Sequence, residues 1–573
     1  MNKKKQKHFV NQGKALALSQ APEITLTEAK ALLASGDTRT ALALLQLGRL
    51  QHPEHAGIAL LFADALHAAG RLKDAVAAYA AGLKLDEISA DGWFGAGCAQ
   101  LALKSYGAAA TALARAATLA PQSGAVQYNL AKAQFELGRV EDSIKGFQRA
   151  AQLDPTLAQM ARASIACIIP GSSQADHAAV LRARREWAAQ EARGLAPRAR
   201  AAAPALGRKL RIGYLSAFFG ARNWMKPVFA LINRHDRDRF EIHMFSDADP
   251  PSAASGYRDH DADYVHDLRG VSNDRAAQII GDIGIDVLVD LNGYSYQSRL
   301  PLLMLRPARR IVGWFNMFAT TGVAAFDWLI GDNAVIGKDE EKYYCERIHR
   351  LPGSYLAFEI LYSVPEVAPP PCVAAGGAIT FGCFGSQYKL TDAVLVAWAR
   401  IMHAVPRARL LLKNGMLDDQ STREDLLGRL AALGIDAARI ELQGRSEHYE
   451  FLEAYRQVDI ALDTFPYNGG TTTTEALWQG VPVLTFDGDR WASRTSKSLL
   501  LAAGLQEWVM QDVHEYVHRA VSLTMDSYIA TKLSALRQDM RSLLKRSQVY
   551  DADGLCHAME TFCFDIWREQ QSQ

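Results

Sequence analysis

One stretch of the chain joins an apolar run, a glycine turn and a row of hydroxyl side chains. Residues 459–478 read DIALDTFPYNGGTTTTEALW, which predicts a buried strand, a turn, and a helix that begins at the threonines. The free N–H groups and the dipole of a helix N-terminus favour negative charge, so this turn is suited to a diphosphate. Glu475, in the first helical turn, is placed to accept hydrogen bonds from a ribose diol. The alternative is a threonine cap with Glu475 in a capping box, but four threonines exceed what one cap needs.

A second strand-to-helix turn carries a lysine. Residues 384–392 read FGSQYKLTD and follow an apolar run. Lys389 is placed to neutralise phosphate charge as a sugar–phosphate bond breaks, a task that a metal ion performs in other transferases. A solvated lysine is the alternative, and position alone does not decide between the two.

The chain after residue 206 supplies the elements that must hold these turns. Short apolar runs alternate there with amphipathic helices, which is typical of βαβ units and parallel sheets. In a first lobe, 206–370, we predict strands at 210–216, 240–247, 285–291, 309–315 and 328–331. In a second lobe, 371–550, we predict strands at 379–384, 408–413, 439–443, 460–463 and 482–486, followed by a C-terminal helix in 551–573. Ligands of doubly wound lobes bind beyond the carboxyl ends of the strands, where both turns lie.

The first third of the chain repeats with a period of 34 residues. Three series of positions keep this step: Gly36, Gly70, Lys104 and Gly138; Ala41, Ala75 and Ala109; Leu45, Tyr79, Leu113 and Phe147. Small residues let paired helices approach, and the large residue fills the gap between them. The period matches the tetratricopeptide class, so we assign 21–157 to such repeats and expect their groove to bind extended peptide. A scaffold or a dimerisation surface is the alternative.

Composition and the remaining segments narrow the class of protein. Residues 1–20 form a basic tail without the apolar core of a signal peptide, and 158–205 read as a helical connector and an Ala/Pro/Arg-rich linker. A net charge of +1 over 573 residues gives no global field for nucleic acid or an anionic membrane, and no apolar run is long enough to span one. The seven cysteines are scattered without ligand spacing, which indicates reduced, mostly buried thiols. We therefore expect a cytoplasmic protein without nucleic-acid or membrane partners.

Together these residues resemble the protein O-linked N-acetylglucosamine transferase family, from about residue 21 to 565. The most specific stretches are LRIGYLS (210–216), HDRDRFEIHMFS (235–246), DVLVDLNGY (286–294), LRPARRIVGW (305–314), 389–413, 458–486 and ASR (492–494). The resemblance implies a fold class of α plus α/β: a tetratricopeptide helical solenoid followed by a glycosyltransferase-B fold of two Rossmann-like doubly wound sheets. It implies transfer of N-acetylglucosamine from UDP to Ser or Thr of a protein, with inversion at the anomeric carbon and with no metal or other cofactor.

The same resemblance implies a site. The diphosphate would lie on Lys389 and on Thr471 to Thr473, and the ribose on Glu475. The predicted nucleotide-sugar side comprises Ser386, Gln387, Lys389, Phe451, Asn468, Gly469, Gly470, Thr471, Thr472, Thr473 and Glu475. The predicted acceptor side comprises Asn292, Tyr294, Thr320, Thr321 and, in the repeats, Asn129. The candidate catalytic residues are Lys389, Asp290 and Arg222.

One of these assignments carries an alternative. Asp290, at the end of a predicted buried strand, is the candidate proton acceptor, but a phosphate oxygen of the donor could do that work instead. No metal ligands are expected, and Asp487 and Asp489 are interpreted as turn residues.

Several departures from the family pattern fall at the predicted cleft. Arg222 stands where the family has a histidine, and an arginine cannot act as a general base at neutral pH because its pKa exceeds about 12. Phe451 and Gly470 replace two further histidines, and WFNMFATTG (314–322) replaces the usual Gly-Tyr-Pro segment. Of the groove-lining asparagine series, only Asn129 is kept.

Three functions fit this sequence. The first is an active protein O-glycosyltransferase that uses UDP-N-acetylglucosamine. The second keeps the chemistry with another nucleotide sugar, such as an acidic one paired with Arg222, and a surface protein such as flagellin as acceptor. The third is a catalytically weak scaffold whose repeats gather partners. The expected partners are a nucleotide sugar and an acceptor protein or peptide, and the oligomeric state, a homo-oligomer included, stays open.

Overall fold

The computed structural model describes residues 21–199, 207–295 and 298–569, and the packing divides the chain into two units. One unit holds Met1–Ala161 with Asp418–Gly428, and the other holds Arg162–Leu417 with Arg429–Gln573. The basic tail predicted at 1–20 lies outside the described residues. Among the helices of the described ranges, none has both the length and the apolar character needed to cross a bilayer.

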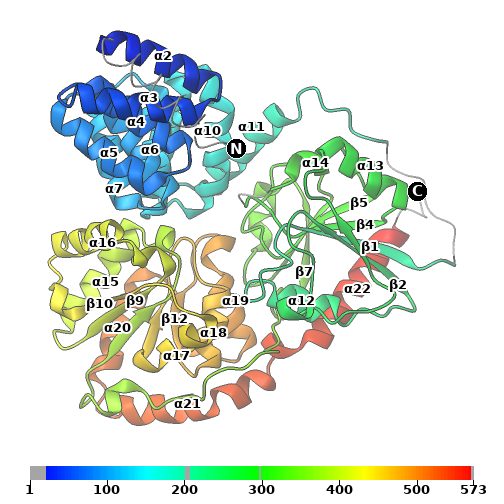
Figure 1. Ribbon diagram of the computed structural model, residues 1–573. Coiled ribbons are helices and arrows are strands. Elements are labelled where there is room, and N and C mark those ends of the chain that lie inside the picture. Colours follow the sequence, from blue (N-terminus) through cyan, green and yellow to red (C-terminus); the bar gives the residue numbers. More distant parts are fainter. Residues whose placement is uncertain (1–20, 200–206, 296–297, 570–573) are drawn as a thin grey trace, which may run out of the picture. The chain divides into compact units, whose positions relative to one another are not determined.

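The first unit is a stack of helix pairs, drawn in blue to cyan in Figure 1. The helices are α2 (Pro22–Ala34), α3 (Thr38–Gln51), α4 (Ala56–Ala68), α5 (Leu72–Leu85), α6 (Ala90–Ala102), α7 (Tyr106–Leu119), α8 (Gly124–Glu136) and α9 (Val140–Leu153). The small residues of the period, Ala41, Ala75 and Ala109, are fully buried, and the large apolar series is buried with them. The predicted helical solenoid is confirmed.

The turn between the two helices of each pair explains the first periodic series. Gly36, Gly70, Lys104 and Gly138 all have positive φ, at 84°, 72°, 61° and 83°. This left-handed conformation suits glycine because a Cβ crowds the following carbonyl oxygen. Lys104 is therefore the strained member of the series. The same unit contains 418–428, where Asp419 accepts a hydrogen bond from Ser105 Oγ (2.6 Å).

The second unit begins with α10 (Ala158–Ile168), which crosses the boundary, and α11 (His177–Glu191), and then forms a seven-stranded parallel sheet. The sheet order is β3-β2-β1-β4-β5-β6-β7. The strands are β1 (Leu210–Ser216), β2 (Phe240–Ser246), β3 (Tyr264–Asp267), β4 (Val287–Asp290), β5 (Arg310–Gly313), β6 (Trp328–Asp332) and β7 (Arg347–Leu351). Its helices include α12 (Lys226–Ile232), α13 (Asn273–Ile283) and α14 (Leu300–Met304). The predicted first lobe is present, with β3 and β7 added.

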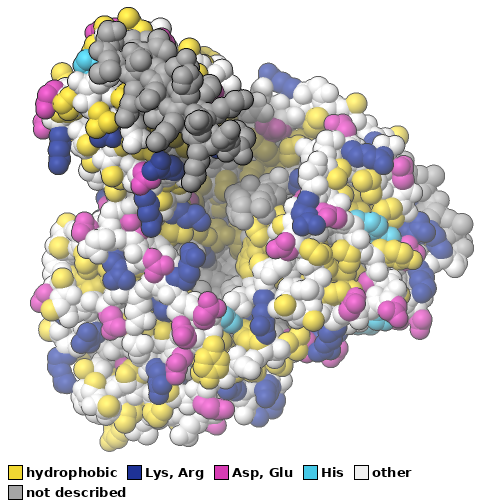
Figure 2. Space-filling view, in the orientation of Figure 1, with side chains coloured by type: hydrophobic (Ala, Val, Ile, Leu, Met, Phe, Trp, Pro, Cys, Tyr) yellow, Lys and Arg dark blue, Asp and Glu magenta, His cyan; other side chains and the backbone are white. Residues whose placement is uncertain are grey.

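A six-stranded parallel sheet forms the second lobe, in the order β10-β9-β8-β11-β12-β13. The strands are β8 (Thr380–Cys383), β9 (Arg409–Lys413), β10 (Ile440–Gln443), β11 (Ile460–Leu462), β12 (Val483–Phe486) and β13 (Val509–Met510). The helices are α15 (Asp392–Ala404), α16 (Gln420–Ala432), α17 (His448–Glu453), α18 (Thr471–Trp478), α19 (Thr495–Ala502), α20 (Val513–Met525) and α21 (Ile529–Lys545). Figure 2 shows basic and acidic side chains interspersed over the drawn face of this lobe, at the lower left.

The last helix, α22 (Ala552–Arg568), follows the second lobe in sequence but packs against the first. Its Glu560 accepts hydrogen bonds from His235 Nδ1 (3.0 Å) and from the Asp236 N–H (2.9 Å). His235 Nε2 lies 2.7 Å from the Tyr214 hydroxyl on β1, and burial lowers the pKa of this histidine. The chain therefore passes between the lobes twice. All seven cysteines are free thiols, four of them buried: Cys372, Cys383, Cys556 and Cys563.

Candidate functional site

The turn between β11 and α18 forms where the sequence predicts it. Gly470 occupies the N-cap position of α18 and has no side chain to cap the helix. The first N–H groups of a helix have no partner within the helix, so they remain available to a ligand. Gly469 leaves no room for a larger residue, since a Cβ there would lie 2.3 Å from Thr473 Oγ1. The turn thus exposes backbone donors at the carboxyl edge of the sheet.

The four threonines of α18 differ in what their hydroxyls contact. Thr473 Oγ1 lies 2.8 Å from Ser496 Oγ, and Thr474 Oγ1 donates to the Thr471 carbonyl oxygen at 2.7 Å. Both residues are buried, whereas Thr471 and Thr472 are partly exposed. Two of the four threonine hydroxyls in the predicted anion-binding turn thus have partners within the protein. Thr473 keeps its backbone N–H for a ligand.

Lys389 lies beside this turn. Its Nζ donates to the Asn468 carbonyl oxygen at 2.8 Å and lies 4.5 Å from the centre of the Tyr467 ring. Burial lowers the pKa of Lys389 to about 8, while the Asp463 carboxylate acts in the opposite direction. One cavity is lined by Lys389, Gly469, Thr472 and Thr473 among other residues. The two predicted motifs therefore converge on one place.

Two buried amide groups next to Lys389 have unused hydrogen-bond donors. Gln387 Oε1 accepts from Asn414 Nδ2 (3.1 Å), but among the described residues nothing accepts from Gln387 Nε2. The Nδ2 of Asn468 is buried and unpaired in the same way. A buried donor without an acceptor is costly, so both groups are suited to ligand oxygens. Ser386, in contrast, is exposed to solvent.

Glu475 joins the two lobes. Its Oε1 accepts from Lys226 Nζ at 2.8 Å and from His448 Nε2 at 3.0 Å, and Lys226 is the first residue of α12 in the first lobe. The ring of Tyr362 lies 5.2 Å from Lys226 Nζ and 4.5 Å from the guanidinium carbon of Arg222. Arg222 is exposed.

The sequence reasoning did not identify three residues of this cluster: Lys226, His448 and Tyr362. The available signal was a second cation four positions after Arg222, in FGARNWMK. His448 also stacks with Phe451, with ring centres 6.4 Å apart. The predicted aromatic residue and the unpredicted histidine thus lie together near Glu475.

On the acceptor side, the side chains of Asp290 and Asn292 accept hydrogen bonds from backbone N–H groups that follow the ends of β4 and β1. The two oxygens of Asp290 accept the backbone N–H groups of Asn292 and Gly293, each at 3.1 Å, and Asn292 Oδ1 accepts the Ala217 N–H at 2.9 Å. Burial raises the pKa of Asp290 to about 7. These contacts give both side chains a local structural task, and proton acceptance by Asp290 stays a prediction.

The other predicted acceptor-side residues are bonded within the protein. Thr320 and Thr321 are buried, and both hydroxyls donate to the carboxylate of Glu346. The Tyr294 hydroxyl donates to the Thr321 carbonyl oxygen at 2.6 Å. Asn129, on α8 of the first unit, donates to the Ala125 carbonyl oxygen at 2.9 Å.

A second cavity borders the N-terminus of α18 from the side of the first lobe. Aromatic rings form much of its wall: Trp224, Phe315, Phe318, Tyr355 and Phe358. Asn223 also lines it and has a buried Oδ1 that accepts no hydrogen bond from the described residues. A mostly apolar pocket with a few placed polar groups is typical of a small-molecule site.

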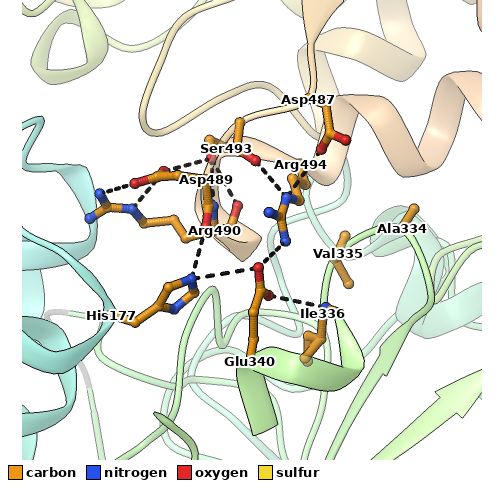
Figure 3. A network of polar contacts seen from close by, with 12 residues as sticks. His177, Ala334, Val335, Ile336, Glu340, Asp487, Asp489, Arg490, Ser493 and Arg494 are labelled. Carbon is orange, nitrogen blue, oxygen red and sulfur yellow. Dashed lines mark hydrogen bonds and ion pairs between the residues drawn. The ribbon is translucent and has the colours of Figure 1, made fainter. Parts of the chain in front are cut away.

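Figure 3 shows a polar network that also links the lobes. Glu340 of the first lobe pairs with Arg494 of the second at 2.7 Å, and His177 of α11 lies 3.6 Å from the same carboxylate. Asp487 pairs with Arg494 (3.2 Å) and Lys497 (2.6 Å), and Asp489 pairs with Arg490. The two aspartates interpreted as turn residues thus have cationic side chains as partners.

Comparison with known proteins agrees with this geometry. Over 366 residues the chain is 32% identical to a rice protein (Oryza sativa subsp. japonica) named probable UDP-N-acetylglucosamine–peptide N-acetylglucosaminyltransferase SPINDLY. The matched region covers 63% of this chain and 39% of the rice protein. It is 23% identical over 484 residues to the Caenorhabditis elegans UDP-N-acetylglucosamine–peptide N-acetylglucosaminyltransferase, covering 64% of this chain and 41% of that one. The chain thus spans about two fifths of the length of these curated relatives.

A solved structure covers more of the chain. A Lys-to-Met variant of the Thermobaculum terrenum O-GlcNAc transferase superposes with a TM-score of 0.77 at 30% identity, covering 90% of this chain and 98% of that one. The expected order of helical repeats and two Rossmann-like lobes is confirmed. Residues 26–91 and 100–165 match tetratricopeptide repeats, and residues 197–362 and 374–559 match the family described as Glycosyl transferase family 41. Since this match covers more than half of the sequence, the chain belongs to glycosyl transferase family 41.

Proposed function

We propose that this chain is a protein O-glycosyltransferase that moves a sugar, in the first place N-acetylglucosamine, from a UDP-sugar to Ser or Thr of a protein in the cytoplasm. The observation that carries the proposal is the convergence of Lys389 with the N-terminus of α18, where Lys389 Nζ lies 2.8 Å from the Asn468 carbonyl oxygen. The choice of donor and acceptor is supported by relatives that are named as UDP-N-acetylglucosamine–peptide N-acetylglucosaminyltransferases. The repeats, with Asn129, would hold the acceptor peptide.

The chemistry follows from where positive charge lies. As the bond between the anomeric carbon and the phosphate oxygen breaks, the leaving diphosphate gains charge, which Lys389 and the N–H groups of α18 stabilise. The acceptor hydroxyl attacks the anomeric carbon from the opposite face, so the configuration inverts. Its proton passes to Asp290 or to a phosphate oxygen of the donor. In this proposal lysine and helix N-terminus do the work of a metal ion, and transfer is independent of metal.

Intact-protein mass spectrometry tests the proposal directly. The purified chain is mixed with UDP-N-acetylglucosamine and with proteins expressed from neighbouring genes, and we expect an acceptor to gain the mass of one N-acetylhexosamine. Chelation of divalent metals by EDTA should leave the rate unchanged, and Lys389→Ala should abolish the product. If calorimetry shows that the purified chain binds neither UDP nor another nucleoside diphosphate, the proposal is wrong.

A second candidate keeps the reaction but changes the donor. Arg222 is exposed beside Tyr362, and among the described residues no carboxylate forms an ion pair with it. A free cation at this place favours a nucleotide sugar with an acidic group. A panel of nucleotide sugars in a thermal-shift assay separates the two candidates, because the first requires the largest stabilisation from UDP-N-acetylglucosamine.

A further inference from the structure

Glu475 has an unsymmetrical set of hydrogen bonds. Both Lys226 Nζ (2.8 Å) and His448 Nε2 (3.0 Å) donate to the same oxygen, Oε1. Within the described ranges no hydrogen-bond donor reaches Oε2, and this oxygen is not fully buried. One carboxylate oxygen is thus fixed, and the other has no donor among the described residues.

The charge of Glu475 is maintained in a buried place. The residue is only 3% exposed, and burial by itself acts to raise its pKa. Lys226 and His448 outweigh that effect and hold the pKa of Glu475 below its ordinary value. The carboxylate is therefore ionised at neutral pH, and an ionised oxygen is a stronger acceptor for a hydroxyl group than a neutral one.

The lysine that fixes Oε1 comes from the other lobe. Lys226 begins α12, whereas Glu475 is the fifth residue of α18, just past the first turn in which the sequence pattern placed it. The side chains of this ion pair are each 4% exposed, so water is a poor substitute for either partner. Without Lys226 the buried carboxylate would either take up a proton or turn away from the cleft.

We propose that Lys226 is a positioning residue for the donor: from the first lobe it holds Glu475 Oε1, so that Oε2 accepts hydrogen bonds from the ribose hydroxyls of the nucleotide sugar. This inference rests on the proposed function, because it requires that a nucleotide occupy the turn at α18. It adds a residue of the first lobe to the recognition of a ligand held mainly by the second.

Calorimetry with UDP and 2′,3′-dideoxy-UDP tests the inference, because the two probes differ only in the ribose hydroxyls. We expect the unaltered chain to bind UDP at least about tenfold more tightly than the dideoxy probe, as hydrogen bonds to a charged group are strong. In Lys226→Met this ratio should fall to about one or two, while the affinity for dideoxy-UDP changes by less than about threefold. Lys226→Arg, which keeps the charge, should restore most of the ratio.

Two further variants separate positioning from a general structural effect. Arg494→Met breaks another ion pair between the lobes, Arg494 with Glu340 (2.7 Å), and should leave the ratio at its original value. Glu475→Gln should lower the ratio by itself, and adding Lys226→Met to it should change nothing more. The double variant buries no unpaired charge, so it gives a folded reference even where Lys226→Met alone unfolds.

Three outcomes would overturn the inference. An equal loss of affinity for both probes in Lys226→Met would mean that the lysine binds the phosphates directly. An unaltered chain that does not distinguish the probes would remove Glu475 from ribose recognition while leaving the proposed function intact. Failure of the unaltered chain to bind either probe or any other nucleoside diphosphate would refute the proposed function, and the inference with it.

Discussion

Replacement of Lys389 by methionine is the sharpest test of the diphosphate site. The substitution keeps the length and apolar stem of the side chain but removes the ammonium group that donates to the Asn468 carbonyl oxygen. A hydrogen bond to a charged group contributes about 1.5–3 kcal/mol, so UDP affinity should fall by roughly 10- to 150-fold. Turnover should fall further, because the charge on the leaving diphosphate is greatest in the transition state.

The depressed pKa of Lys389 gives the same experiment a pH signature. With a pKa of about 8, the amine is about nine-tenths charged at pH 7 and about one-tenth charged at pH 9. Since only the charged form attracts phosphate, the affinity of the unaltered chain for UDP should fall about tenfold between these pH values. Lys389→Met should lose this dependence.

The stability of the free chain changes in the opposite direction. Because the folded pKa of Lys389 lies below that of an unfolded lysine, the unfolded state holds more protons between about pH 8 and 10, and this group makes stability rise with pH there. Thermal unfolding of both forms without ligand checks this sign and shows that the variant is folded. A variant that kept the full tenfold pH dependence of UDP binding would refute the assignment of that dependence to Lys389.

Four other substitutions have definite expectations. Lys104→Gly should raise the unfolding free energy of the repeats by about 1 kcal/mol in urea titrations, since it relieves the positive φ of 61°, whereas Gly70→Lys should lower it. Asp290→Asn should remove an acidic limb near pH 7 from the profile of kcat/KM, because the pKa of Asp290 is about 7; full turnover in this variant would exclude Asp290 as proton acceptor. Thr321→Val should lower the unfolding free energy by about 1–3 kcal/mol, because the buried Glu346 carboxylate loses a hydroxyl donor; an unchanged urea midpoint would contradict this.

The interior strands could be predicted from the sequence because they are buried on both faces and read as continuous apolar runs. The prediction of 210–216 coincides with β1 (Leu210–Ser216), and 460–463 differs by one residue from β11. The missed strands lie at the sheet edges. β3 reads YVHD with largely exposed residues, β7 reads RIHRL, and β13 has only two residues. Such segments carry neither a long apolar run nor a clear alternation.

In the candidate site, too, features set by neighbouring residues could be predicted, and contacts between distant residues could not. The glycine turn and the start of α18 depend on neighbouring residues, so the sequence pattern predicted them, whereas the contact of Lys389 with Asn468 joins positions 79 residues apart. The Lys226–Glu475 pair joins positions 249 residues apart, and no local pattern indicates it. For the same reason the sequence could not tell that Thr320 and Thr321 are bonded to a buried glutamate 26 and 25 residues downstream.

The charges of the cleft explain why a carboxylate is tolerated where a diphosphate is proposed to bind. Glu475 lies four residues after Thr471, the first residue of α18, and its negative charge would repel the phosphates if it stood alone. Lys226 and His448 offset that charge without removing the acceptor oxygen, since both contact Oε1. A cation of the first lobe thus stabilises the negative charge of Glu475, in the second lobe. A shift of a few ångströms between the lobes would break the 2.8 Å pair, so recognition of the ribose would depend on the lobes being closed.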